Sequence, residues 1–369
     1  MTRSSPSRPE AAGGTELLRD LAATPRPTGS VAIAAARERV ASELAALGYS
    51  PRAFPFEFSA LPGRYGTPLF GAAALGVAGI AGHLGAGGGR FAPLAILLVG
   101  AVVLAGAGRW LASSGVLSLG AMREGGVNLE FTMPAARAPR VWLCAHLDTK
   151  SQPVPTLVRA GGILLTAIGF LGTLALALAA AAGIATTRTP WVAAALVTLG
   201  GALPVMMSVV GIHSPGALDN ASGVVAVVQA ARQLASPDVG VLITDAEELG
   251  LAGALAWAEM PHVRRDAIVL NCDGVDDQGA NVVMFSRPAP EGLIAAAERA
   301  GARRRRMPLG LLTDSVAFTG AGLASVTFSR GSLASLARVH SARDDLSRLR
   351  GTGIAPVASL MAATANQLR

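Results

Sequence analysis

The sequence predicts an α/β domain with a mixed, mostly parallel central sheet flanked by helices, interrupted by two inserted transmembrane helical hairpins. Two observations lead to this prediction. In the C-terminal part of the chain, short runs rich in Val, Ile and Leu alternate with amphipathic helical patterns, which is typical of a parallel sheet with helices on its faces. In addition, 51% of the 369 residues are hydrophobic, a fraction that soluble proteins seldom reach.

The elements of the α/β domain are expected in three separate stretches of the chain. Apolar residues at three- and four-residue spacing predict a helix over residues 30–47, followed by a turn into a strand. Two further strands are expected in "GVNLEF" and "RVWLCAHLD". Beyond residue 213 we expect helices in "ASGVVAVVQAARQLA" and "GLAGALAWAEM", and strands in "VGVLITD" and "AIVLNCD".

Two long hydrophobic blocks interrupt this pattern. No charged residue occurs between Arg64 and Arg90, or over residues 91–108. The second block is uncharged over residues 161–187 and again over residues 191–212. Because a membrane-spanning helix needs about 20 apolar residues, each block is long enough for two spans. The alternative of buried core helices is disfavoured by the presence of four such runs in pairs.

The expected domain organisation follows from these blocks. Residues 1–30 contain no apolar stretch long enough for a signal peptide and are expected to form a mobile tail. Because each hairpin crosses the membrane twice, the segments before, between and after the hairpins lie on one side and can fold together. The hairpins are expected over residues 66–117 and 157–212, and the α/β domain over residues 31–65, 118–156 and 213–369.

The charged and sulfur-containing residues narrow the class of protein. The net charge is +7, but Lys150 is the only lysine and Ala and Gly are abundant, which indicates an arginine-rich composition rather than a nucleic-acid-binding surface. Cys144 and Cys272 are the only cysteines, so no disulfide framework is expected and both are interpreted as buried free thiols. Arg303–Arg306 are expected either to bind anionic lipid headgroups or to form a solvated strand edge.

Histidine and acidic residues occur where the predicted strands end. In α/β sheets, ligands and catalytic groups gather outside the carboxyl ends of the strands, so these side chains are expected to converge. Imidazole nitrogen and carboxylate oxygen are ligands that suit zinc, and two metal ions about 3.5–4 Å apart can share a bridging carboxylate. The residues concerned are His146, Asp148, Asp219, Glu247, Glu248, Asp273 and His340.

These motifs resemble those of the M28 family of zinc peptidases, which includes bacterial aminopeptidases and is related in fold to glutaminyl cyclases. The matching elements, in the family's order, are "AHLD", "GALDNASG", "EE" after a strand, "NCD" after a strand, and "HSARD". The resemblance covers roughly residues 31–60, 119–150 and 213–369 and leaves out both hydrophobic hairpins. It implies a zinc-exopeptidase fold and a two-zinc peptidase acting on peptide substrates.

The resemblance also implies a metal ligand set. His146 and Asp273 would hold one zinc ion. Glu248 and His340 would hold the other, and Asp219 would bridge the two.

Two further acidic residues receive roles from the same resemblance. Asp148 would accept the spare N–H of the His146 ring and fix its tautomer. Glu247 would be the general base, taking a proton from the metal-bound water and passing it to the leaving amine. Asp344 is expected either to brace the loop of His340 or to cap the helix that follows.

One position departs from the family pattern. Family aminopeptidases often carry a tyrosine just before the last histidine, placed to stabilise the oxyanion, and here that residue is Val339. Zinc alone, the Ser341 hydroxyl or a backbone N–H would then take its place. The alternatives are therefore another zinc-dependent amidohydrolase, a glutaminyl-cyclase-like enzyme, or a non-catalytic membrane receptor or scaffold.

The expected location is a membrane of the bacterial inner-membrane type, crossed by about four transmembrane helices. The short turns between paired spans carry only Arg90 and Arg188, whereas more basic residues flank the spans on the side of the α/β domain. The positive-inside rule therefore predicts a cytoplasmic catalytic domain. Because a hairpin is inserted between His146 and Asp219, the active site is expected to open close to the membrane surface.

Overall fold

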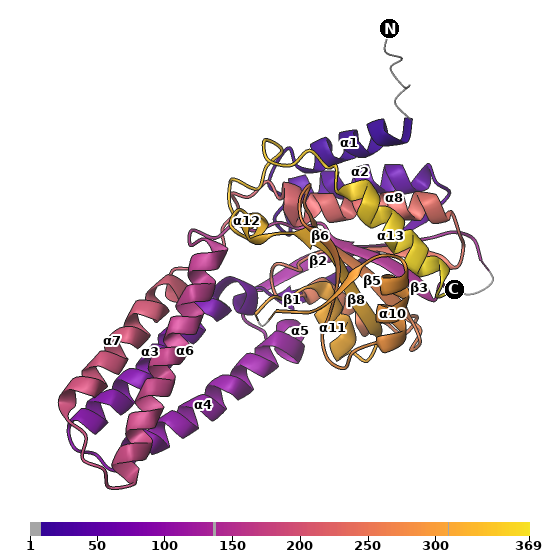
Figure 1. Ribbon diagram of the computed structural model, residues 1–369. Helices are drawn as coiled ribbons and strands as arrows, with labels where there is room; N and C mark the ends of the chain where they lie inside the picture. The colour runs from indigo at the N-terminus through magenta and orange to yellow at the C-terminus, as the bar shows by residue number, and fades with distance from the viewer. Residues whose placement is uncertain (1–8, 136–137, 309) are drawn as a thin grey trace. The chain divides into compact units, whose positions relative to one another are not determined.

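The computed structural model describes residues 9–135, 138–308 and 310–369, and the chain divides into two compact units (Figure 1). The first, which we call the sheet unit, comprises Met1–Phe58, Arg123–Ser151 and Ile212–Arg369. The second, the helical unit, comprises Ser59–Met122 and Gln152–Gly211. The helical unit is thus made of the two segments for which the sequence predicts hydrophobic hairpins.

Within the described residues, the strands of the sheet unit form one eight-stranded sheet in the order β1-β2-β4-β3-β5-β8-β6-β7. The four central strands run parallel to one another, β2 is antiparallel to β4, and β6 is antiparallel to β8. This confirms the predicted mixed, mostly parallel sheet. The strands are β1 (Ser50–Ser59), β2 (Arg123–Thr132), β3 (Val141–His146), β4 (Val239–Thr244), β5 (Ile268–Val275), β6 (Ala280–Phe285), β7 (Arg303–Arg306) and β8 (Ala324–Gly331).

Both faces of the central strands are buried, as their continuous apolar sequences require. Side chains of a strand alternate between the two faces of the sheet. Accordingly, Leu143 of β3 belongs to the larger core cluster, whereas its neighbours Trp142 and Cys144 belong to a second cluster on the other face. In that second cluster the rings of Trp142 and Trp257 meet edge to face, with centroids 5.3 Å apart. Both cysteines are buried free thiols, as predicted.

Helices cover both faces of the sheet (Figure 1). The larger core lies under α1, α2, α8 and α13, and the second core includes residues of α9 and α11. The helices of this unit are α1 (Pro9–Leu21), α2 (Val31–Ala45), α8 (Ser222–Leu234), α9 (Ala252–Ala258), α10 (Glu291–Arg299), α11 (Asp314–Gly320), α12 (Leu333–Leu336) and α13 (Ile354–Asn366). The kinked turn η2 (Ala217–Ala221), whose backbone is not helical at Asp219 and Asn220, precedes α8.

The N-terminal segment differs from the predicted mobile tail over residues 1–30. Residues 9–21 form helix α1, and Leu17, Leu18 and Leu21 are buried in the larger core. The prediction was wrong for this part. The Pro, Ser and Arg content suggested a tail, but three leucines share one helical face and can pack on the core. Residues 1–8 lie outside the described residues.

The arginine run forms strand β7 at one edge of the sheet, and all four residues are exposed. Arg304 pairs with Glu291 of α10 at 2.7 Å and lies over the ring of Phe285. This placement agrees with the interpretation of a solvated, basic strand edge, in which charge discourages pairing with another chain.

The helical unit contains four helices long and apolar enough to cross a membrane. Large apolar side chains cover much of their outer surface, and the buried positions are mostly small residues. Membrane insertion itself stays a prediction. The helices are α3 (Leu61–Ala86), α4 (Ala92–Trp110), which continues through η1 (Leu111–Gly115) and α5 (Val116–Ser118), α6 (Thr156–Ala181) and α7 (Arg188–Met206).

Small residues let these helices approach closely, as is common in membrane proteins. A Cβ atom at Gly201 of α7 would lie 2.3 Å from the backbone nitrogen of Thr166 in α6. A Cβ atom at Gly85 of α3 would lie 2.4 Å from the ring of Trp191. Glycine has a low helix propensity, but in this unit the glycines make the close contacts between helices possible.

Candidate metal centre

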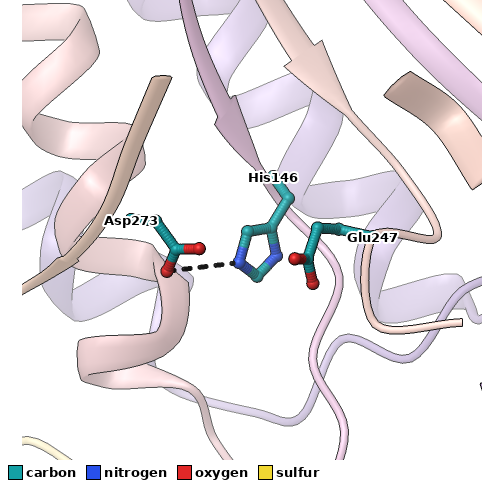
Figure 2. A group of neighbouring side chains, drawn as sticks. All are labelled: His146, Glu247 and Asp273. Carbon is teal, nitrogen blue, oxygen red and sulfur yellow. Dashed lines mark ion pairs between the residues drawn. The ribbon is translucent and has the colours of Figure 1, made fainter. Parts of the chain in front are cut away.

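The predicted metal ligands converge at the carboxyl ends of the central strands, although they come from distant parts of the chain. His146 ends β3, Glu247 and Glu248 follow β4, and Asp273 lies in β5. Figure 2 shows the imidazole of His146 between the carboxyl groups of Asp273 and Glu247. This arrangement is what parallel strands with adjacent carboxyl ends produce.

Asp219 lies between the two histidines. Its Oδ1 is 3.1 Å from Nε2 of His146, and its Oδ2 is 3.0 Å from Nε2 of His340. His340 Nε2 is also 3.3 Å from Oε1 of Glu248, and His146 Nε2 is 3.9 Å from Oδ1 of Asp273. The five residues predicted as ligands are therefore brought together, with one carboxylate facing both imidazoles.

The chemistry of these groups fits divalent metal ions. Two sets of possible ligands have their ligand atoms within 4.8 Å of one another: His146, Glu247 and Asp273 in one set, and Asp219, Glu248 and His340 in the other. The buried atoms His146 Nε2 and Glu248 Oε1 form no hydrogen bond with any described residue. Buried polar atoms seldom remain unpaired, so a cation at this place would satisfy them.

The carboxylate of Asp148 holds the loop after β4, and the backbone carbonyl of the same residue faces the His146 ring. It accepts the backbone N–H of Glu247 at 3.1 Å and that of Glu248 at 3.0 Å. Nδ1 of His146 lies 3.1 Å from the backbone carbonyl oxygen of Asp148 and 3.5 Å from its carboxylate. Because a carbonyl oxygen can only accept, Nδ1 carries the proton and the Nε2 lone pair is left for a metal ion.

Asp344 braces the Asp219 loop, a function that differs from both expectations for this residue. Its carboxylate accepts the N–H of Leu218 at 2.7 Å and that of Asp219 at 3.0 Å. The peptide bond between Asp219 and Asn220 is cis, and the Asn220 amide donates to the carbonyl oxygen of Cys272. The Asp344 side chain and the backbone of Cys272 in β5 thus hold the loop that carries the central carboxylate.

Arg26, which sequence reasoning placed in the tail, supports the same loop. Its buried guanidinium donates to the carbonyl oxygens of Leu147 at 3.0 Å, Pro215 at 2.8 Å and Gly216 at 3.1 Å. Burial lowers the pKa of Arg26 to about 10, although nearby carboxylates act in the opposite direction. A lone arginine between two prolines gives no local signal of this role.

Lys150 is a second functional residue that sequence reasoning missed. Its ammonium Nζ lies 2.6 Å from Oε2 of Glu248, which leaves Oε1 facing His340. Burial alone would raise the pKa of Glu248, but His340 and Lys150 lower it to about 2. The only lysine of the chain therefore keeps this carboxyl group ionised and orients it.

Two further acidic groups of the centre, Glu247 and Asp219, differ in environment. Burial raises the pKa of Glu247 well above the ordinary value, and the neighbouring Glu248 and Asp273 act in the same direction. Asp219 is also buried, but the neighbouring His146 and His340 hold its pKa well below the ordinary value. The pKa values of these two carboxyl groups are thus shifted in opposite directions.

Contacts with the buried Asp276 and hydrogen bonds within the loop hold the segment that carries His340. The buried Asp276 accepts the Ser335 hydroxyl at 2.5 Å and pairs with Arg338 at 2.8 Å. The Ser341 hydroxyl donates to the carbonyl oxygen of Arg338 at 2.6 Å. Because its proton is used there, Ser341 is not placed to act as the oxyanion donor that Val339 lacks.

Comparison with known proteins supports the resemblance seen in the motifs. Residues 203–365 match the model of peptidase family M28. No curated protein sequence matches the chain.

Solved structures share the fold at low sequence identity. A zinc aminopeptidase from Bacillus subtilis has a TM-score of 0.55 at 15% identity, with 99% of this chain and 96% of that chain covered. The aminopeptidase from Aneurinibacillus sp. strain AM-1 has a TM-score of 0.55 at 13% identity, covering 97% and 93%. Porphyromonas gingivalis glutaminyl cyclase has a TM-score of 0.56 at 14% identity, covering 98% of each chain. These similarities show the aminopeptidase fold, which glutaminyl cyclases share.

Asp148→Asn is expected to weaken zinc binding about 10- to 100-fold, because an amide nitrogen would replace one of the two oxygens that hold the Glu247 and Glu248 backbone. Competition with a chromophoric chelator, on the purified full chain, measures this affinity. Asp345→Asn is the control, since that carboxylate bonds only within its own turn, to Ser347. Native zinc affinity in the Asp148 variant would contradict this role for its carboxylate.

Proposed function

Because residues 203–365 belong to peptidase family M28, we propose that the chain is a membrane-anchored di-zinc metallopeptidase that hydrolyses peptide bonds, acting as an aminopeptidase. The observation that carries the proposal is the position of Asp219, with one oxygen toward each of two histidines. A single-metal site does not need a carboxylate that faces two separate imidazoles.

His146 and Asp273 would hold one zinc ion, Glu248 and His340 the other, and Asp219 would bridge them. When bound, zinc supplies Lewis acidity that activates water and polarises a carbonyl group. The protein contributes fixed ligand orientation. The Asp148 carbonyl sets the His146 tautomer, Lys150 sets the free oxygen of Glu248, and Asp344 holds Asp219.

Glu247 is the proposed general base. It is buried beside His146 and Asp273, and its backbone N–H is fixed by Asp148, so its carboxyl group is aimed into the centre. It would accept a proton from the attacking water and return it to the nitrogen of the leaving group.

A second reaction on the same scaffold is favoured by the surroundings of Val339. The residue immediately before His340 is Val339 and not a tyrosine, and the Ser341 hydroxyl donates to the carbonyl oxygen of Arg338. A different zinc-dependent reaction at an amide, such as amidohydrolysis or cyclisation of an N-terminal glutamine, would need other oxyanion contacts. The fold agrees with both reactions, because it is shared by aminopeptidases and glutaminyl cyclases.

The membrane anchor is the part of the proposal supported by composition. Four helices of the helical unit are long and apolar enough to cross a bilayer. The distribution of arginines around their ends favours a cytoplasmic sheet unit by the positive-inside rule. A non-catalytic receptor is disfavoured, because such proteins usually lose metal ligands and here all five converge.

A peptide panel separates the two reactions. We expect peptides with a free N-terminal amine to lose their first residue and blocked peptides to remain intact, as mass spectrometry of the products would show. Cleavage of blocked peptides only would exclude an aminopeptidase. Loss of ammonia from N-terminal glutamine without cleavage would identify the cyclase.

Glu247→Gln is expected to lower peptide hydrolysis by at least about 100-fold, because the amide cannot accept the proton. Zinc content, measured by elemental mass spectrometry on the same sample, should stay unchanged. A variant that loses zinc together with activity would make Glu247 a ligand. Unchanged hydrolysis would remove the general-base role altogether.

A further inference from the structure

The loop that carries His340 also bears an exposed apolar patch. Leu333 and Leu336 of α12 are 73% and 36% exposed. Among the described residues of the sheet unit, the other exposed large hydrophobic side chains are Val31, Ile212 and Leu312, each alone on its own segment. Two exposed leucines on one short helix set this loop apart from the other described segments of the sheet unit.

The internal contacts of this loop fix which side of α12 faces outward. The Ser332 and Ser335 side chains cap the helix, and Ser335 donates to the buried Asp276. Arg338 also reaches Asp276 and the carbonyl oxygen of Arg348. The polar side of the helix is therefore occupied, and the leucines are held toward the outside together with two exposed alanines, Ala334 and Ala337.

Three exposed arginines follow on the same loop. Arg343, Arg348 and Arg350 form no ion pair with any described acidic residue. The nearby carboxylates accept backbone N–H groups rather than arginine side chains: Asp345 accepts from Ser347, and Asp277 accepts from Arg350 and Thr352. We call Leu333, Leu336, Arg343, Arg348 and Arg350 the Leu–Arg surface.

Exposed leucines and exposed arginines without an ion-pair partner, carried by one loop, fit an anionic lipid surface. Leucines enter the boundary between headgroups and acyl chains, and arginines bind the phosphates. The chain itself carries four candidate spans, so a bilayer would be covalently close to the sheet unit and even weak contacts would be populated. An acidic polypeptide would match the arginines but gives no reason for the exposed leucine pair.

We propose that the Leu–Arg surface binds anionic lipid headgroups of the bilayer, an inference that rests on the proposed membrane anchoring. His340 lies four residues after Leu336 and three residues before Arg343. Lipid contact on both sides of it would hold the loop that supplies a metal ligand. The composition of the bilayer would in this way act on the metal centre.

The test uses the full chain in vesicles, with a fluorophore on Leu333→Cys and nitroxide-labelled lipid in both leaflets. Cys144 and Cys272 are buried, so labelling is confined to the new thiol. Val31→Cys is the matched control, since Val31 is 87% exposed on a different helix. We expect strong quenching at position 333 and little at position 31 when the vesicles contain phosphatidylglycerol.

The combined substitution Arg343→Gln, Arg348→Gln and Arg350→Gln should reduce quenching at position 333 to the level at position 31, and so should high salt. Zinc content of this variant checks that the loop is still folded. Flotation after alkaline extraction tests membrane anchoring separately.

The outcomes are distinguishable. Absence of quenching at position 333 in a chain that resists extraction would overturn the Leu–Arg proposal and leave the anchor intact. A chain that fails to float would overturn both. A spectral shift of the probe with soluble polyglutamate, but not with lipid, would assign the surface to an acidic polypeptide instead.

Discussion

The carboxylate of Asp219, held between the imidazoles of His146 and His340, is the contact around which the rest of the sheet unit is arranged. The chain between His146 and Asp219 contains the second hydrophobic hairpin, and His340 lies near the end of the fold. These three residues meet only when β3, β5 and β8 are paired and the Asp219 loop is closed. Asp344 and Arg26 close that loop from two sides.

Burial of so many carboxyl groups has an electrostatic cost. An unpaired buried carboxylate costs several kcal/mol, and Asp148, Asp219, Glu247 and Glu248 are all removed from water here to a large extent. Backbone N–H groups, two histidines and Lys150 offset part of this cost. His146 Nε2 and Glu248 Oε1, which form no hydrogen bond with any described residue, show where the compensation is incomplete. A metal ion bound at these atoms would therefore also stabilise this unit.

The convergence of the proposed metal ligands could be predicted from the sequence because each follows a recognisable strand or loop pattern. Their supporting partners could not, because those contacts join residues far apart in the chain. Arg26 meets Gly216 and Lys150 meets Glu248 across long sequence separations, and neither has a local signature. The hydrogen bonds from the Glu247 and Glu248 backbone to the Asp148 carboxylate had no sequence signal either, for the same reason.

The remaining differences between the sequence predictions and the structure also arise from contacts between residues far apart in the chain. The sequence analysis did not predict helix α1, because the burial of its leucines depends on contacts with core residues far away in the chain. The hydrophobic hairpins were found because composition alone suffices for long apolar helices. The exposed leucines of α12 had no sequence signal, since two leucines in a short loop predict burial as readily as exposure.

The zinc stoichiometry of the purified full chain tests the central claim most directly. The bridging position of Asp219 predicts two zinc ions per chain, one in each of the variants His146→Ala and His340→Ala, and none in the double variant. A native chain with a single zinc ion that survives His146→Ala and disappears in His340→Ala would contradict the two-metal centre.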